Sequence, residues 1–153
     1  MVHLLHRDAF TDDSLNSDFG ALMHYFHERQ LPTALICHAP APLAAAPVVD
    51  GRWIYAGYRM TCFKTVVDTM LETVPLARRF SGHLNDDPTE LLASRGAEIS
   101  QTRAPMGSKV VIDRELLTGQ DPFSAKALGA AFVDKVRTST GFPLAPGTQD
   151  AQR

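Results

Sequence analysis

The chain of 153 residues has no excess of either charge, no basic block and no long apolar run. Its 15 basic and 17 acidic residues give a net charge of −2, and no basic helical face stands out, so nucleic acid is not an expected partner. The apolar runs are far shorter than the roughly 18 residues that a membrane-spanning helix needs, so no membrane insertion is expected. A hydrophobic share of 44% still suffices for a core, and the length suits one domain.

Cysteine is equally scarce, because Cys37 and Cys62 are the only two in the chain. A secreted domain held together by disulfides would carry more cysteines in a shorter chain, so both are expected to be reduced thiols. The first ten residues, MVHLLHRDAF, lack a basic start followed by an apolar stretch, and no signal peptide is expected. Together these absences predict a cytoplasmic protein.

The hydrophobic spacing that is present indicates helices alternating with strands, an α/β pattern. Apolar residues recur on one helical face between Leu15 and Phe26, and Pro32 ends that helix. Residues 33–36, TALI, form a short apolar run without alternation, which is typical of a strand buried on both faces in a parallel sheet. The cap and turn residues further predict an Ala-rich helix after this strand, a turn at 48–51, a short helix at 64–72, a helix at 88–95 ended by Gly96, a hairpin at 109–118, a last helix that begins at Asp121-Pro122, and a flexible tail at 139–153.

The stretch TALICHAP places Cys37 and His38 directly after the buried strand. A nucleophile between a strand and the next helix sits in a sharp, strained turn that lifts its side chain clear of the sheet, and the small residues Ala39 and Ala41 suit such a turn. The positive end of the following helix would favour a thiolate. His38 could carry the proton or stabilise the thiolate as an imidazolium, and a carboxylate would be needed to orient it.

Each of these residues also has a structural interpretation. Cysteine is among the most buried residue types, so Cys37 could equally be a small core side chain, and Cys62 within the apolar MTCF is interpreted as core. His24 and His27 share a face of the predicted helix, but no HExxH pattern or matching ligand spacing accompanies them. No metal site is predicted there.

The order of the motifs nevertheless resembles one family. PTALICHAPAPLA is similar to the nucleophile elbow of the ThiJ/PfpI superfamily, also called class I glutamine amidotransferase-like. SGHLNDDPTELLASRGAEI and KVVIDRELLTGQDPFSAKALGAAFV resemble the C-terminal half of its glyoxalase III and heat-inducible chaperone-deglycase branch. The resemblance implies a flavodoxin-like three-layer α/β sandwich, here a partial domain over residues 1–138 that lacks the N-terminal strands and helices. It also implies a possible homodimer.

By the same resemblance, Cys37 is the nucleophile, His38 its partner, and Asp68 in TCFKTVVD the aspartate that orients the histidine. The family thiolate attacks the aldehyde of a 2-oxoaldehyde such as methylglyoxal and forms a hemithioacetal. A proton then moves between the two carbons, and a 2-hydroxy acid leaves without glutathione. Glycated proteins are the substrates of related deglycases. We expect no cofactor and no metal ion.

The chain departs from the family pattern in two ways. Ala39 stands where relatives usually have glycine, which is a mild change because alanine still permits close packing. The family's N-terminal half, which supplies a glutamate beside the cysteine and a Gly-Gly-His loop, has no counterpart beyond Met1-Val2-His3 and Asp8 as a remnant of that loop. The strand before Cys37 would then present an unpaired edge and an uncovered apolar face, unless a partner or a longer native chain covers them.

Three functions are open on these grounds. The first is a cysteine-dependent glyoxalase III-like lyase or a related protein deglycase. The second is a non-catalytic holdase or partner-binding remnant of the fold, which the missing half favours. The third is a cysteine peptidase or amidase of the same superfamily, which the closing segments favour least.

Overall fold

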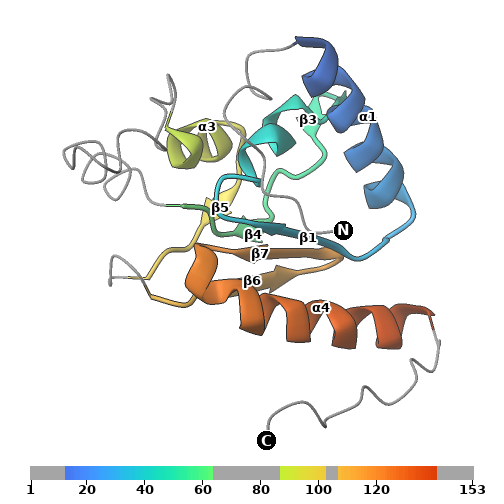
Figure 1. Ribbon diagram of the computed structural model, residues 1–153. Coiled ribbons are helices and arrows are strands. Elements are labelled where there is room, and N and C mark those ends of the chain that lie inside the picture. The colour runs from blue at the N-terminus through green and yellow to red at the C-terminus, as the bar shows by residue number, and fades with distance from the viewer. Residues whose placement is uncertain (1–12, 64–86, 103–106, 141–153) are drawn as a thin grey trace, which may run out of the picture.

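A computed structural model describes residues 13–63, 87–102 and 107–140 of the chain, which fold as helices around a small mixed sheet (Figure 1). The elements are, in chain order, α1 (Asp13–Glu28), β1 (Thr33–Ile36), the 3-10 helix η2 (Ala41–Ala45), β2 (Val48–Val49), β3 (Arg52–Trp53), β4 (Arg59–Met60), α3 (Pro88–Ser94), β5 (Glu98–Ile99), β6 (Val110–Asp113), β7 (Leu116–Gly119), the 3-10 helix η4 (Pro122–Ser124) and α4 (Ala125–Thr140).

The main sheet of the described residues has the order β1-β7-β6. β1 runs parallel to β7, with Thr33 opposite Leu116 at one end and Ile36 opposite Gly119 at the other. β6 and β7 form the predicted antiparallel hairpin. Every residue of β1 and of β7 is buried, which confirms the prediction of a strand covered on both faces in a parallel pair.

Alternate residues of β1 and β7 face two different hydrophobic clusters. Ala34, Ile36 and Leu117 pack with Leu128 of α4, which lies along one face of the sheet in Figure 1. Leu35 packs on the other face, where α1, η2 and α3 lie, in a larger cluster that contains Met23, Leu43, Trp53, Tyr55, Tyr58, Met60, Leu92 and Leu116. A fully buried leucine contributes roughly 1.5–3 kcal/mol, so these two layers on a sheet account for much of the stability.

The sequence predicted that the strand before Cys37 has an unpaired edge and an uncovered apolar face. Within the described ranges, β1 pairs with β7 alone and so lies at the end of the main sheet. Its faces, however, are covered, because all four of its residues are buried. The expected uncovered apolar face is therefore not at β1. Large apolar side chains are exposed elsewhere, among them Leu22 and Tyr25 on α1 and Val48 and Val49 on β2.

Most of the predicted helices and turns are confirmed. Asp87 caps α3 by accepting from the backbone of Thr89 at 2.7 Å, Pro88 occupies its first turn, and Gly96 follows it with a φ of 98°. The segment after Cys37, predicted as a helix, is the five-residue 3-10 helix η2, which ends where Ala46 turns extended before Pro47.

Three further predictions need correction or lie beyond what is described. The turn predicted at 48–51 is a small hairpin of β2 and β3, closed by Asp50 and Gly51, which both have positive φ angles of 50° and 75°. Residues 139 and 140, predicted as part of the flexible tail, belong to α4, which ends at Thr140. The helix predicted at 64–72 and the tail from residue 141 onward fall outside the described residues.

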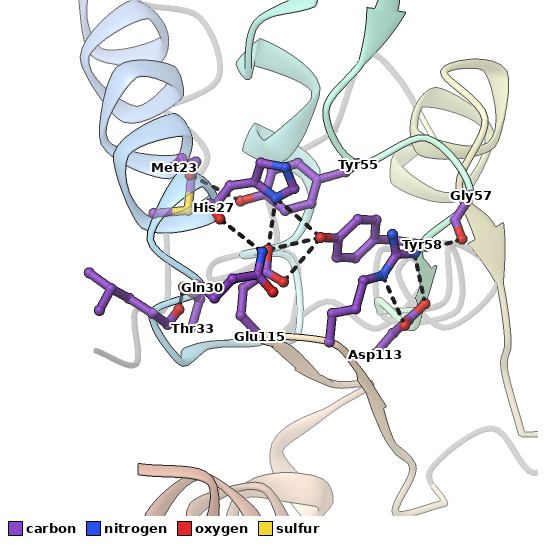
Figure 2. A network of polar contacts seen from close by, with 11 residues as sticks. Met23, His27, Gln30, Thr33, Tyr55, Gly57, Tyr58, Asp113 and Glu115 are labelled. Carbon is purple, nitrogen blue, oxygen red and sulfur yellow. Dashed lines mark hydrogen bonds and ion pairs between the residues drawn. The ribbon is translucent and has the colours of Figure 1, made fainter. Parts of the chain in front are cut away.

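A buried polar network joins α1 to the sheet at the amino ends of β1 and β7 (Figure 2). The carboxylate of Glu115, 2% exposed, lies 2.8 Å from Nδ1 of His27, and both its oxygens accept from the hydroxyl of Tyr58 at 3.0 Å. Burial and the nearby carboxylate raise the pKa of Tyr58 and of Tyr55, so both hydroxyls stay protonated and Tyr58 keeps its role as donor. His27 is thus held by the buried carboxylate of Glu115, whereas Nε2 of His24 lies 3.4 Å from the exposed carboxylate of Glu28.

The same network reaches the turn of the β6–β7 hairpin. The guanidinium of Arg114 lies 3.4 Å from the centroid of the Tyr58 ring and donates to the carbonyl of Gly57 at 3.0 Å. Asp113 accepts from the backbone of Arg59 at 2.8 Å. The network therefore ties α1, the segment before β4 and the hairpin together at the end of the sheet opposite Cys37.

Candidate functional site

Cys37 follows the last residue of β1 and has a φ of 64°, in the left-handed region that non-glycine residues rarely adopt. Its N–H donates to the carbonyl of Gly119 at 2.9 Å, and its own carbonyl accepts from the N–H of Phe63 at 2.9 Å. Such strain costs of order 1–3 kcal/mol and persists where the surroundings hold it in place, often at functional sites. The predicted sharp turn after the strand is therefore confirmed.

His38 lies directly beside the thiol. Its Nδ1 is 3.3 Å from Sγ of Cys37, within hydrogen-bond reach for sulfur, and its ring packs on Phe63 with centroids 4.7 Å apart. The turn is closed by the N–H of Ala39, which donates to Ile36 at 3.1 Å. Ala39 is 0% exposed, so a small residue is needed there. Thiol and imidazole are thus placed for proton transfer between them.

Two predicted features of this site are not settled by the described residues. Asp68, predicted to orient His38, lies in the range 64–86 outside them. The segment expected to direct its positive end at the sulfur is the short η2, so the stabilisation of a thiolate by this helix stays a prediction.

Cys62 lies in the core, as predicted. Its side chain is 0% exposed and its Sγ is 3.6 Å from the hydroxyl of Thr89. Burial, partly opposed by the bond to Thr89, raises the pKa of the Cys62 thiol to about 11. Since the thiolate is the nucleophilic form, a protonated and buried Cys62 is not expected to react with electrophiles at neutral pH.

In the native protein at pH 8, we expect iodoacetamide to leave Cys62 unmodified, because its raised pKa keeps the thiol protonated and its burial excludes the reagent. Mass mapping of the alkylated positions measures this. In urea both cysteines should be labelled, which serves as the control. Modification of Cys62 in the folded chain as fast as in urea would contradict the prediction.

Sequence reasoning missed a set of polar side chains at the carboxyl ends of β4 and β7. Among the described residues, three buried polar atoms have no hydrogen-bond partner: Oγ1 of Thr61, Nε2 of Gln120 and Oδ2 of Asp121. An unsatisfied buried polar group costs about 1–3 kcal/mol, so each needs an explanation. Their only signal in the sequence was their position directly after apolar strands, where ligands bind in open α/β sheets.

Neither a metal centre nor a membrane span emerges from the described ranges. They contain no group of three or more His, Cys, Asp or Glu side chains that could hold a metal ion. None of their helices combines the length and the apolar character needed to cross a bilayer.

Comparison with known proteins identifies relatives by sequence and by structure. No family model matches the chain. Among curated proteins, the chain is 28% identical over 116 residues to the glutamine amidotransferase-like class 1 domain-containing protein 1 of Bos taurus, covering 76% of this chain and 49% of that protein. The chain thus spans about half the length of the curated relative it matches.

Solved structures show the same fold. The Rapid Encystment Protein 24 KDa of Francisella tularensis superimposes with a TM-score of 0.73 at 18% identity, over 88% of this chain and 56% of that one. Glyoxalase III from Candida albicans superimposes with a TM-score of 0.70 at 16% identity, over 88% and 55%. These neighbours confirm the predicted α/β fold.

Proposed function

Because the chain has the fold of the ThiJ/PfpI, class I glutamine amidotransferase-like superfamily, we propose that it is a cysteine-dependent lyase of glyoxalase III type. Its substrates would be small 2-oxoaldehydes such as methylglyoxal, or the related adducts on glycated proteins. The observation that carries the proposal is the strained turn at Cys37, with Nδ1 of His38 3.3 Å from the sulfur at the carboxyl end of two parallel strands.

The proposed reaction consumes one water and no redox partner. The thiol proton of Cys37 passes to His38, the sulfur bonds to the aldehyde carbon, and the carbonyl electron pair becomes an alkoxide that takes up a proton. The proton on that carbon then moves to the neighbouring ketone carbon through an enediolate. The resulting thioester of a 2-hydroxy acid is hydrolysed, which releases the acid and restores the thiol.

His38 and Asp68 have distinct tasks in this proposal. His38 takes the thiol proton and can return it to the oxygen of the hemithioacetal, since its Nδ1 lies within reach of the sulfur. Asp68 is proposed to fix the orientation of the imidazole, as the carboxylate of a catalytic triad does. The resemblance implies that an upstream glutamate assists the proton transfer between the carbons, and the chain spans about half the length of the curated relative it matches.

A second candidate is a holdase that binds unfolded clients without turnover. The exposed apolar side chains of Leu22, Tyr25, Val48 and Val49 favour it, because such residues on a surface can bind other apolar segments. Holdase action does not need the thiol.

The decisive assay is lactate formation from methylglyoxal by the purified chain without glutathione. We expect lactate well above the spontaneous rate, with no further increase when glutathione is added. Suppression of client aggregation is measured on the same preparation. No lactate above background from protein that is folded by circular dichroism, together with suppressed aggregation, would overturn the lyase proposal in favour of the holdase.

A further inference from the structure

Three residues carry a buried polar atom without a partner, namely Thr61, Gln120 and Asp121. Of these, Gln120 is the one whose backbone lies next to Cys37 in the pairing of β1 and β7. The last paired residues are Ile36 and Gly119, and Cys37 and Gln120 directly follow them. The N–H of Cys37 donates to Gly119 at 2.9 Å, so the two strands are still joined at that point. Gln120 therefore lies at the carboxyl end of its strand, beside the elbow.

The amide of Gln120 is fixed in one orientation. Its side chain is 1% exposed, and its Oε1 accepts from the backbone N–H of Thr102 at 2.9 Å. A backbone N–H can only donate, so the oxygen must face Thr102 and the NH₂ group must be the other end. That end, Nε2, is the atom without a partner.

The other unpartnered atoms differ from Gln120 in what they offer. Asp121 uses Oδ1 to cap η4 through the backbone of Ser124 at 3.2 Å, so its carboxylate has a structural task. Thr61 is 0% exposed, and its hydroxyl can both donate and accept. It precedes by two residues Phe63, whose N–H holds the carbonyl of Cys37. Of the three, only Gln120 offers a pure donor, and it follows the β7 residue that pairs with the residue before Cys37.

We propose that Nε2 of Gln120 donates a hydrogen bond to the substrate, namely to the oxygen on the ketone carbon of a 2-oxoaldehyde. This inference rests on the proposed function and adds a binding and catalytic residue to it. Negative charge develops on that oxygen in the enediolate, and a fixed donor in a buried site stabilises such charge without having to reorganise. The unsatisfied donor of the free protein thus gains its partner when the substrate binds.

Two variants test this, with one matched control. Gln120→Glu keeps the acceptor for Thr102 and, with its carboxyl ionised, removes the donor, and Gln120→Met replaces the amide with an apolar side chain of similar length. Gln101→Met is the control, because the amide nitrogen of Gln101 already has partners in Cys62 and Thr89, at 3.4 and 3.2 Å. It should lose stability and keep its kcat.

We expect both Gln120 variants to lower kcat for lactate formation about 100-fold, the usual effect of removing one donor from a developing oxyanion, with a smaller change in KM. Gln120→Met should be less stable than the native chain, because it also removes the acceptor of the Thr102 N–H, so its kcat is compared in protein that is folded by circular dichroism. Unchanged kcat in a folded variant would overturn the inference and leave the proposed function standing. The amide would then hold only a buried water.

A second readout does not depend on turnover. Methylglyoxal bound to Cys37 as a hemithioacetal protects the thiol from a small thiol reagent, methyl methanethiosulfonate. If the native chain makes no lactate, the proposed function fails, but Gln120→Met should still need about ten times more methylglyoxal for the same protection, since one hydrogen bond is lost. Equal protection in the two proteins would overturn the inference on its own.

Discussion

Cys37→Ser will reduce lactate formation from methylglyoxal to the spontaneous rate. A serine hydroxyl is a weak nucleophile unless a strong base activates it, whereas a thiol forms its anion near neutral pH. The substitution changes one buried atom at a position that is 7% exposed, and the neighbouring Nδ1 of His38 stays in place. The loss of turnover should therefore occur without loss of the fold, and lactate is measured beside circular dichroism.

Cys62→Ala is the matched control for this experiment. Cys62 is the second of the two cysteines, it is fully buried, and its pKa is raised to about 11, so it should contribute nothing to turnover. We expect its variant to keep lactate formation within about twofold, with a modest loss of stability for a small cavity. Residual activity in Cys37→Ser that disappears only in the double variant would show that the nucleophile had been misassigned.

Glu115→Ala will lower the free energy of unfolding by about 3 kcal/mol, one of the largest losses available in this chain. The carboxylate holds His27 of α1 at 2.8 Å and accepts from Tyr58 through both oxygens. Its removal leaves the buried hydroxyl of Tyr58 with Nδ1 of His27, 3.1 Å away, in place of two carboxylate oxygens, and opens a cavity beneath α1. Urea unfolding followed by circular dichroism measures the change at pH 7.

The exposed Glu98 on β5 provides the comparison, because removal of a surface carboxylate usually changes stability by less than about 0.5 kcal/mol. A double-mutant cycle of Glu115→Gln with Tyr58→Phe isolates their interaction, which we expect to reach about 1–3 kcal/mol. A loss in Glu115→Ala no greater than in Glu98→Ala, or a coupling near zero, would mean that the network seen in Figure 2 does not stabilise the fold.

The elements that the sequence predicted well are those with strong local signals. β1 has an unbroken apolar run, α3 begins with Asp87-Pro88 and ends before Gly96, and the β6–β7 hairpin has apolar strands around a polar turn. The position of Cys37 after a buried strand was enough to predict its strained turn, because a side chain at that point must leave the sheet.

What the sequence could not reveal depends on contacts between distant residues. His27 and Glu115 are 88 positions apart, and nothing around either residue indicates the other. In the sequence, Gln120 is only a polar residue after a strand. The hydrogen bond from Thr102 in the structure shows which end of its amide is occupied. The shortness of η2 after Cys37 follows from Pro47, because the residue before a proline is confined to extended backbone, whereas Pro40 and Pro42 in its first turn are compatible with any helix.

The two ends of the β1–β7 pair are specialised differently, and this separation bears on how such a protein can change over evolutionary time. The amino ends hold Glu115, His27 and Tyr58, and the carboxyl ends hold Cys37 and Gln120. Under the proposed function, substitutions at the carboxyl ends would alter which molecules react while the anchoring of α1 is left intact. A lineage with this arrangement can therefore explore new substrates without first gaining surplus stability, provided that drift spares the opposite end of the sheet.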